Sequence, residues 1–382
     1  MDIVKDFRDG AQAQKIARAI GELVKQVPDS HRRPLQFMEV CGGHTHSIFR
    51  YGLNQLLPDE IEFVHGPGCP VCVLPMGVVD DCVSMAERDN VIFTTFGDAM
   101  RVPGSEKSLL QAKADGADVR MVYSPLDALK LAQQNPDKEV VFFGLGFETT
   151  MPSTALTVQK AAQMGINNFS LFCNHITIIP TIKAMLDSPD MQLDGFIGPG
   201  HVSMIIGTRP YRFIAEDYKR PLVVAGFEPL DIMQSVYMLV KQLVEGRAEI
   251  ENQYNRIVPE AGNRHALMAI NDVFELRPYF EWRGLGSIDH SGVQMREKYA
   301  QWDAEKKFDL PRRKIADPDA AQCGEVVKGV LKPHQCKLFG TACTPETPIG
   351  ALMVSSEGAC AAYYNYGSVQ IPVSEVTRSR TI

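Results

Sequence analysis

The chain lacks several features that would assign it to common protein classes. It has no apolar run near the ~18–20 residues that a membrane-spanning helix needs. It has no basic excess, since 39 Lys and Arg stand against 46 Asp and Glu for a net charge of −7, which argues against binding nucleic acid or an anionic membrane. Its first residues lack the basic start and apolar core of a secretory signal. We therefore expect a cytoplasmic protein with neither nucleic acid nor membrane among its partners.

The glycine-rich turn after one predicted strand does not carry a standard nucleotide-binding motif. The segment 144–150 (GLGFETT) follows a predicted strand but fits neither GxGxxG nor GxxxxGK[ST]. The sequence therefore gives little support to nucleotide binding.

Cysteine is the residue type that the chain has in unusual supply. Structural disulfides are rare in the cytoplasm, so the nine cysteines indicate metal or redox chemistry. Two of them, Cys82 and Cys173, lie inside apolar segments and are expected to be buried core residues.

The order of apolar segments predicts an α/β fold. Strands and helices alternate from Pro34 to about Ile250, which is typical of parallel sheets covered by helices. Strands are expected at 35–40, 61–65, 91–97, 118–124, 139–146, 169–175, 193–200 and 220–227, with helices between them.

Three pairs of segments suggest an internal duplication. Segments 37–41 and 169–173 both begin with Phe and end with Cys, and Gly-Pro-Gly recurs at 66–68 and 198–200, each time 132 positions later. The third pair is 96–98 and 226–228. We expect two similar parallel-sheet α/β domains, whose strand ends face a shared cleft, and a third, mostly helical or irregular domain. The predicted divisions are N-terminal helices packing on the third domain (1–30), the first α/β domain (31–136), the second (137–250) and the C-terminal domain (251–382).

The segment that ends the first predicted strand carries the clearest reactive group. Cys41 follows LQFMEV, two glycines allow a sharp turn, and His44 and His46 open the next helix. The carboxyl edge of such a sheet binds ligands, and a helix N-terminus favours a thiolate. Cys41 is thus either a nucleophile with a histidine base, a ligand in an open soft-metal site, or part of a structural loop.

A second reactive loop follows the strand IEFVH. Its sequence GPGCPVC presents Cys69 and Cys72 at CxxC spacing, which suits a disulfide pair or two ligands to a soft metal. His65, just before the loop, is expected to hydrogen-bond it.

The C-terminal segment has four cysteines and little periodicity. The spacing Cys323-x12-Cys336-x6-Cys343-x16-Cys360 contains no CxxC pair. Four thiolates suit structural zinc or an iron–sulfur cluster, and the wide spacing favours [4Fe–4S]. A loop-rich segment of this kind buries little apolar surface and needs a bound metal or cluster to stabilise it.

Three further residues are candidates for the cleft. Glu148 and Glu228 each follow Gly-Phe at a strand end, where a carboxylate serves as a base or ligand partner, or equally as a first-turn acid favoured by the helix dipole. His201 lies 132 positions after Cys69 and is expected in the cleft.

Taken together, long and unusual motifs resemble those of the HypD family of [NiFe]-hydrogenase maturation proteins. They are CGGHTHSIFRYGL, HGPGCPVCVLP, TFGDAMRVPG, GLGFETTMPS, PGHVSMIIG, AGFEPLDI and the CKLFG–SSEGAC run, and they cover nearly the whole chain in order.

The resemblance implies an assembly scaffold with redox activity more than a turnover enzyme. HypD-like proteins work with the HypC chaperone to build the Fe(CN)2(CO) unit, with cyanide arriving through HypE and HypF, and the unit passes to the hydrogenase large subunit. By this resemblance Cys41 binds the iron with His44 beside it, and Cys69 and Cys72 form a redox pair. It also implies that Cys323, Cys336, Cys343 and Cys360 hold a [4Fe–4S] cluster in the third domain.

A different class of function also fits the thiols. In this alternative the chain is a stand-alone thiol-dependent transferase or oxidoreductase, with Cys41 as nucleophile and a structural zinc near the C-terminus.

Overall fold

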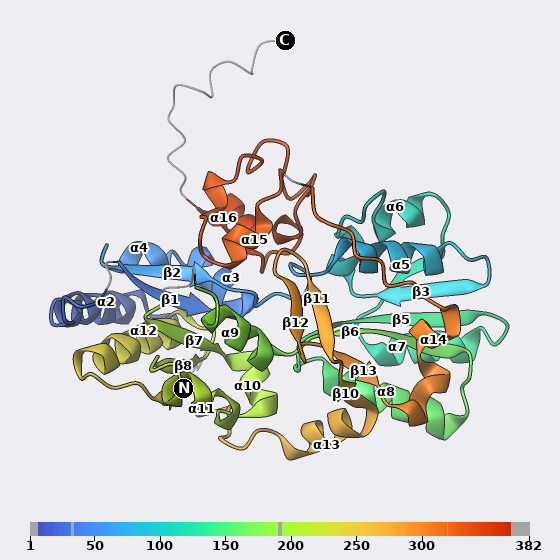
Figure 1. The fold of residues 1–382 in the computed structure, drawn as a ribbon, viewed down its shortest axis with the longest axis horizontal. Helices are drawn as coiled ribbons and strands as arrows, with labels where there is room; N and C mark the ends of the chain where they lie inside the picture. The colour runs from blue at the N-terminus through green and yellow to red at the C-terminus, as the bar shows by residue number, and fades with distance from the viewer. Residues whose placement is uncertain (1–6, 32–33, 190–192, 319, 368–382) are drawn as a thin grey trace, which may run out of the picture.

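Two parallel β-sheets lie side by side in the protein (Figure 1). The structure is a computed structural model that describes residues 7–31, 34–189, 193–318 and 320–367. The strand orders are β2-β1-β7-β8-β9 in the first sheet and β4-β3-β5-β6 in the second, and all pairs within both are parallel. The prediction of an α/β fold built on parallel sheets is confirmed.

Most strands are short, apolar and buried, as expected where helices cover both faces of a parallel sheet, whereas the edge strands β4 and β9 are partly exposed. All five residues of β3 are buried, as are all seven of β6. The first sheet comprises β1 (Leu35–Glu39), β2 (Ile61–His65), β7 (Gly195–Pro199), β8 (Leu222–Ala225) and β9 (Ile250–Asn252). The second comprises β3 (Val91–Thr95), β4 (Val119–Met121), β5 (Glu139–Gly146) and β6 (Phe169–His175).

Helices occupy the connections between strands, as the predicted alternation requires, although α10 had not been predicted. They are α3 (Gly42–Arg50), α4 (Leu53–Leu56), α5 (Met76–Ala86), α6 (Leu109–Ala114), α7 (Pro125–Gln134), α8 (Met151–Met164), α9 (Ile178–Leu186), α10 (Gly200–Ile206), α11 (Arg212–Glu216) and α12 (Pro229–Val244), with short 3-10 turns η1 (Gly97–Arg101) and η2 (Arg209–Tyr211). Within the described ranges, none of the helices is both long and apolar enough to cross a membrane.

The two sheets share one strand order. Numbered along the chain within each sheet, both read 2-1-3-4, and the first sheet adds a fifth strand. Strand β1 therefore corresponds to β3, and β7 to β5. The 132-residue spacing is the wrong guide to this likeness, because it pairs β1, second in its sheet, with β6, fourth in the other. An apolar strand leading into a glycine turn recurs wherever a buried parallel strand ends, so local similarity does not specify a place in the sheet.

The predicted division at residue 136 does not coincide with the division between the sheets. The first sheet takes its strands from 35–65 and 195–252, and the second takes its own from 91–175. The chain thus leaves the first sheet after β2 and returns at β7. Strand pairing is a tertiary contact, so chain order alone could not reveal this crossing.

The N-terminal helix also lies elsewhere than expected. Helix α2 (Gly10–Val24) begins at Asp9, whose carboxylate accepts from the amides of Ala11 and Gln12. It packs on α12, and Ile20 and Val24 join the core around the first sheet. The prediction that residues 1–30 pack on the third domain is wrong for this helix, because its apolar residues share a core with buried residues of α12 such as Val236. Residues 1–6 lie outside the described ranges.

Much of the predicted third domain packs on the second sheet. Helix α13 (Arg264–Val273) contacts α8, and Phe274, Met295 and Trp302 share a core with β5 and β6. The remaining elements of this stretch are β10 (Phe274–Leu276), β11 (Tyr279–Trp282), β12 (Gly286–Asp289), β13 (Val293–Met295), η3 (Glu297–Trp302) and α14 (Ala304–Phe308).

Residues 321–367, which we call the cysteine-rich cap, follow an extended linker. The cap holds α15 (Cys323–Val327), η4 (Pro333–Gln335), η5 (Ala351–Met353) and α16 (Ala359–Tyr366). We call each sheet with its covering helices a lobe. Helix α16 packs on α3 of the first lobe, while Val326 and Met353 share a core with helix α5 of the second lobe. The cap therefore bridges the two lobes (Figure 1).

Candidate functional site

A cleft of about 490 Å³ lies where the carboxyl ends of the two sheets meet. The strand order reverses between β1 and β7 in the first sheet and between β3 and β5 in the second, and such switch points bind ligands in α/β proteins. Loops from both switch points line the cleft, as expected for strand ends facing a shared cleft. Its lining includes Cys41, His201, Val202, Phe96, Gly97, Asp98, Gly146, Phe147, Thr149 and Glu357.

Backbone contact between two loops holds Cys41 at the lip of the first sheet. Cys41 is the N-cap of α3, as the sequence predicts, and the amide of Gly42 donates to the carbonyl of Gly68 at 3.1 Å. A Cβ on Gly68 would lie 2.2 Å from the Cys41 amide nitrogen. Only glycine permits this approach, so the Gly-Pro-Gly turn joins the two reactive loops.

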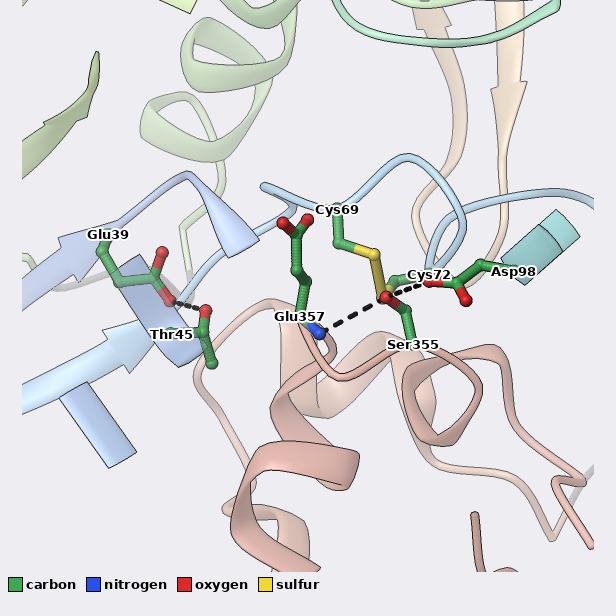
Figure 2. The surroundings of a disulfide bond; sticks show 7 residues. All are labelled: Glu39, Thr45, Cys69, Cys72, Asp98, Ser355 and Glu357. Carbon is green, nitrogen blue, oxygen red and sulfur yellow. Dashed lines mark hydrogen bonds between the residues drawn. A yellow bond between two sulfur atoms is a disulfide. The ribbon is translucent and has the colours of Figure 1, made fainter. Parts of the chain in front are cut away.

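Glu39, a residue that the sequence reasoning missed, anchors this region. Its carboxylate is fully buried and accepts from the Thr45 hydroxyl (Figure 2). It also accepts from the amide of Cys41 at 3.0 Å and from His65 Nδ1 at 2.8 Å. A buried charge is tolerated when it is hydrogen-bonded in this way. The signal was present, since Glu39 is the charged residue of an otherwise apolar run that leads into Cys41. His65 thus hydrogen-bonds Glu39 at the end of β1, whereas the sequence predicted a bond to the loop that follows His65.

Two histidines and a phenylalanine form a stack beside the thiol. The Phe227 ring packs against His44 at 4.6 Å and His201 at 3.9 Å between centroids. His201 Nδ1 lies 3.9 Å from Cys41 Sγ. His44 Nε2 lies 3.0 Å from the carbonyl of Gly226, whereas its buried Nδ1 has no hydrogen-bond partner within the described residues. Phe227 was missed because only its neighbour Glu228 is ionisable.

Burial keeps these groups neutral. It lowers the pKa of His44, and it lowers the pKa of His201 to about 4, with a further contribution from His44. Burial, with Glu357 next in importance, raises the pKa of Cys41 despite the opposing amides of Gly43 and His44. The expectation that the helix N-terminus favours a free thiolate is therefore wrong here, because the cost of burial exceeds the gain from two amides.

Cys69 and Cys72 form a disulfide at the edge of the cleft (Figure 2). A Cβ on Gly358 would lie 3.0 Å from Cys72 Sγ, so the disulfide touches the segment just before Cys360. In the same segment Ser355 donates to Asp98 at 2.8 Å. The pair thus lies between the cleft and the cysteine-rich cap.

Glu357, also missed by the sequence reasoning, projects from the cap into the cleft. Burial, and then the charges of Asp98 and Glu39, raise its pKa. A Cβ on Gly42 would lie 2.5 Å from Glu357 Cβ. Its position within SSEGAC, close to Cys360, was the available signal.

The two acidic candidates lie outside the lining of the cleft. Glu148 is buried and accepts from the amide of Ile178 at 3.0 Å, while its Oε2 has no hydrogen-bond partner within the described ranges. Burial raises its pKa to about 7. Glu228 caps α12 and binds Arg8 at 2.5 and 2.9 Å. No contact places either of them on Cys41, and their functional roles stay predictions.

The four C-terminal cysteines line one small apolar pocket in the cap. Amides of Ile349 and Gly350 each donate to Cys343 Sγ at 3.4 Å. A Cβ on Gly350 would lie 2.3 Å from Cys323 Sγ, so only glycine leaves room for that sulfur.

These thiols affect one another's protonation. Burial first, and then the nearby Cys323, Cys343 and Cys336, raise the pKa of Cys360. Four such thiols ionise together only when a cation balances them. Across the described residues, no three or more His, Cys, Asp and Glu side chains are arranged to hold a metal ion.

The fold and the cleft define a class: an α/β protein with two parallel sheets and a cysteine at the switch point of one of them. Its family is also clear, because residues 11–367 match the HypD family model, described as "Hydrogenase formation hypA family". The chain belongs to the HypD family, as the sequence motifs predicted.

Several curated relatives match nearly the whole chain. Hydrogenase maturation factor HypD of Rhodobacter capsulatus is 61% identical over 374 residues, 97% of this chain and 99% of that protein. The protein of the same name from Escherichia coli (strain K12) is 58% identical over 366 residues, 96% of this chain and 98% of its own. Hydrogenase maturation factor HypD2 of Bradyrhizobium diazoefficiens is 52% identical over 374 residues, 96% of this chain and 97% of that protein.

Proposed function

We propose that this chain is a scaffold for hydrogenase maturation, on which the Fe(CN)2(CO) unit is assembled together with a HypC-type chaperone. The names of its relatives support maturation as the process. The observation that carries the finer proposal is the position of Cys41, a thiol at a switch point that opens into a cleft of about 490 Å³. Cyanide comes from HypE with HypF upstream, and the hydrogenase large subunit receives the unit through the chaperone.

The environment of Cys41 favours a metal ligand over a nucleophile. A nucleophilic cysteine needs a lowered pKa, whereas burial raises the pKa of Cys41 and keeps His201 neutral. A bound metal ion deprotonates a thiol by its own charge. The thiolate is a soft anchor suited to iron that carries cyanide and carbon monoxide.

Neighbouring residues have supporting roles in this proposal. Glu39 fixes the Cys41 amide, and Phe227 fixes the His44 and His201 rings. Glu357 and Asp98 face the same cleft. Cys41 contributes the thiol in the lining of this cleft. An iron bound by this single soft ligand has other coordination positions open to cyanide and carbon monoxide.

The cap has the donor set for a [4Fe–4S] cluster held by Cys323, Cys336, Cys343 and Cys360. Their shared pocket, the two amides that donate to Cys343 and the space left by Gly350 all suit cluster thiolates. When bound, the cluster supplies electrons one at a time.

Cys69 and Cys72 are placed to pass electrons between cap and cleft. Cys72 touches Gly358, two residues before Cys360, while the Gly68 loop touches Cys41. Opening the disulfide takes two electrons and two protons, so an external one-electron donor must act twice.

Replacing both Cys69 and Cys72 with serine tests the relay. The visible absorption of the cluster is expected to persist while hydrogenase maturation stops, because only the electron path is broken. Normal maturation in the double variant would exclude the relay.

The scaffold and the alternative enzyme differ in their metals. Anaerobically purified protein is expected to contain about four irons with sulfide, and its complex with the chaperone to show vibrational bands of bound cyanide and carbon monoxide. One zinc, no sulfide and no such bands would instead support a thiol-dependent transferase or oxidoreductase with Cys41 as nucleophile.

A further inference from the structure

A buried arginine lies where three segments meet. They are the antiparallel hairpin of β11 and β12, the loop that carries Cys69 and Cys72, and the cysteine-rich cap. Arg283 forms the turn between β11 and β12, and its side chain is 2% exposed. Its amide donates to the carbonyl of Val73 at 2.8 Å, directly after Cys72 in the chain. Its Nη1 donates to the carbonyl of Pro103 at 3.2 Å. The hairpin therefore anchors the loop that follows the disulfide.

In the described part of the chain, the guanidinium has one anionic partner and keeps unused hydrogen-bond donors. Its Nε lies 2.6 Å from Asp317 Oδ1 in an ion pair without hydrogen-bond geometry, and Asp317 is 18% exposed. Its Nη2 is buried and has no hydrogen-bond partner within the described residues. Burying a cation without full pairing is costly, so its surroundings call for a further negative group.

The cysteine-rich cap provides the position for that group. Gly284, next to Arg283, packs so closely on the cap that a Cβ on Gly324 would lie 2.2 Å from the Gly284 carbonyl oxygen. A Cβ on Gly284 would also lie 3.6 Å from the backbone carbonyl carbon of Cys323. The turn that carries Arg283 is therefore in contact with the backbone of a proposed cluster ligand.

We propose that Arg283 is the buried charge partner of the cluster in the cap and sets its reduction potential, with Asp317 acting in the opposite direction. The inference rests on the proposed function, because it requires a cluster on Cys323 and its three partner cysteines. Arg283 is a positioning and tuning residue and is not itself a ligand.

The sign follows from charge. Reduction adds one negative charge to the cluster, and a nearby cation stabilises that form more than the oxidised one. Removing the cation lowers the potential, while removing the neighbouring carboxylate raises it. The low dielectric of a buried site makes both effects larger than at the surface.

The test is a redox titration of anaerobically purified full-length variants, followed by the visible and EPR signals of the cluster. For Arg283→Gln we expect, at one poised potential, a roughly tenfold lower ratio of reduced to oxidised cluster, equal to about 59 mV for a one-electron couple. Asp317→Asn is expected to shift the ratio upward, and Arg283→Lys to stay near wild type because the charge remains.

The control is Lys314→Gln, which removes an exposed positive charge from the same linker and is expected to leave the ratio unchanged. Equal ratios in wild type, Arg283→Gln and Asp317→Asn would overturn the inference while leaving the cluster in place. Where Arg283→Gln fails to hold a cluster, an unchanged ratio in Asp317→Asn overturns it too. A wild-type protein without iron and sulfide would instead overturn the proposed function.

Discussion

The two sheets have the same strand order and different chemistry at matching positions. Two residues past the end of β1 lies Cys41, and two past β3 lies Gly97. Two residues past β7 lies His201, and two past β5 lies Glu148. The first switch point thus has a thiol and an imidazole. At the second, the matching residues are a glycine and a glutamate, whose carboxyl accepts a hydrogen bond from the first residue of α9.

This difference separates the location of a site from its chemistry. Both switch points line the same cleft, because strand order creates the crevice in each sheet. The side chains after the strands then decide what is bound. In the proposed function, the first sheet provides the metal ligand and the second sheet lines the opposite side of the cleft.

The largest expected effect is the loss of the first thiol. Cys41→Ala removes the proposed soft ligand, so the chaperone complex is expected to lose the vibrational bands of bound cyanide and carbon monoxide. The matched control is Cys173→Ala, which removes a buried thiol from the second sheet at a cost of about 1 kcal/mol. Bands at normal intensity in Cys41→Ala protein would refute the assignment of the iron to the first switch point.

The last residues of β1 and β3 form a second matched pair. In Glu39→Gln the new amide group is itself a donor and faces groups that donate to Glu39 in the wild type. The free energy of unfolding is therefore expected to fall by about 3 kcal/mol, and the iron occupancy is expected to fall too. Thr95→Val removes only a 3.4 Å contact to the Phe143 carbonyl and should cost under about 1 kcal/mol. Urea unfolding and iron analysis measure both; equal effects would show that Glu39 does not anchor the site.

The pH dependence of folding stability gives a third comparison, which concerns Glu148. Burial raises its folded pKa to about 7 from 4.5, so the folded state holds its proton more tightly than the unfolded state. Stability from this group is full below about pH 4.5 and is lost as pH rises through about 7. Glu148→Gln should remove that loss and be more stable than wild type by about 3 kcal/mol at pH 8. A constant difference across this range would contradict the buried neutral carboxyl.

The matching residue of the first sheet should show the opposite slope. The folded pKa of His201 is lowered to about 4 from 6.5, so its stability contribution is present above about pH 6.5 and lost as pH falls toward 4. His201→Gln, measured by the same urea titrations, therefore differs from wild type mainly on the acid side.

Local patterns predicted the elements well. The apolar runs identified β1 and β2 within a residue, and the Gly-Gly-His pattern placed His44 in the first turn of α3. Cys41 and the CxxC loop were selected as candidates because thiols have characteristic chemistry whatever their surroundings. Glu39 and Glu357 were harder to find, since a lone carboxylate gains meaning only from the partners that surround it.

The sequence by itself determined the alternation of strands and helices, the family and the candidate thiols, because periodicity and residue type are local properties. Only the tertiary structure decided which strands share a sheet, that α2 covers α12, and that burial suppresses the Cys41 thiolate. These properties depend on contacts between distant segments, and on the water that those contacts exclude.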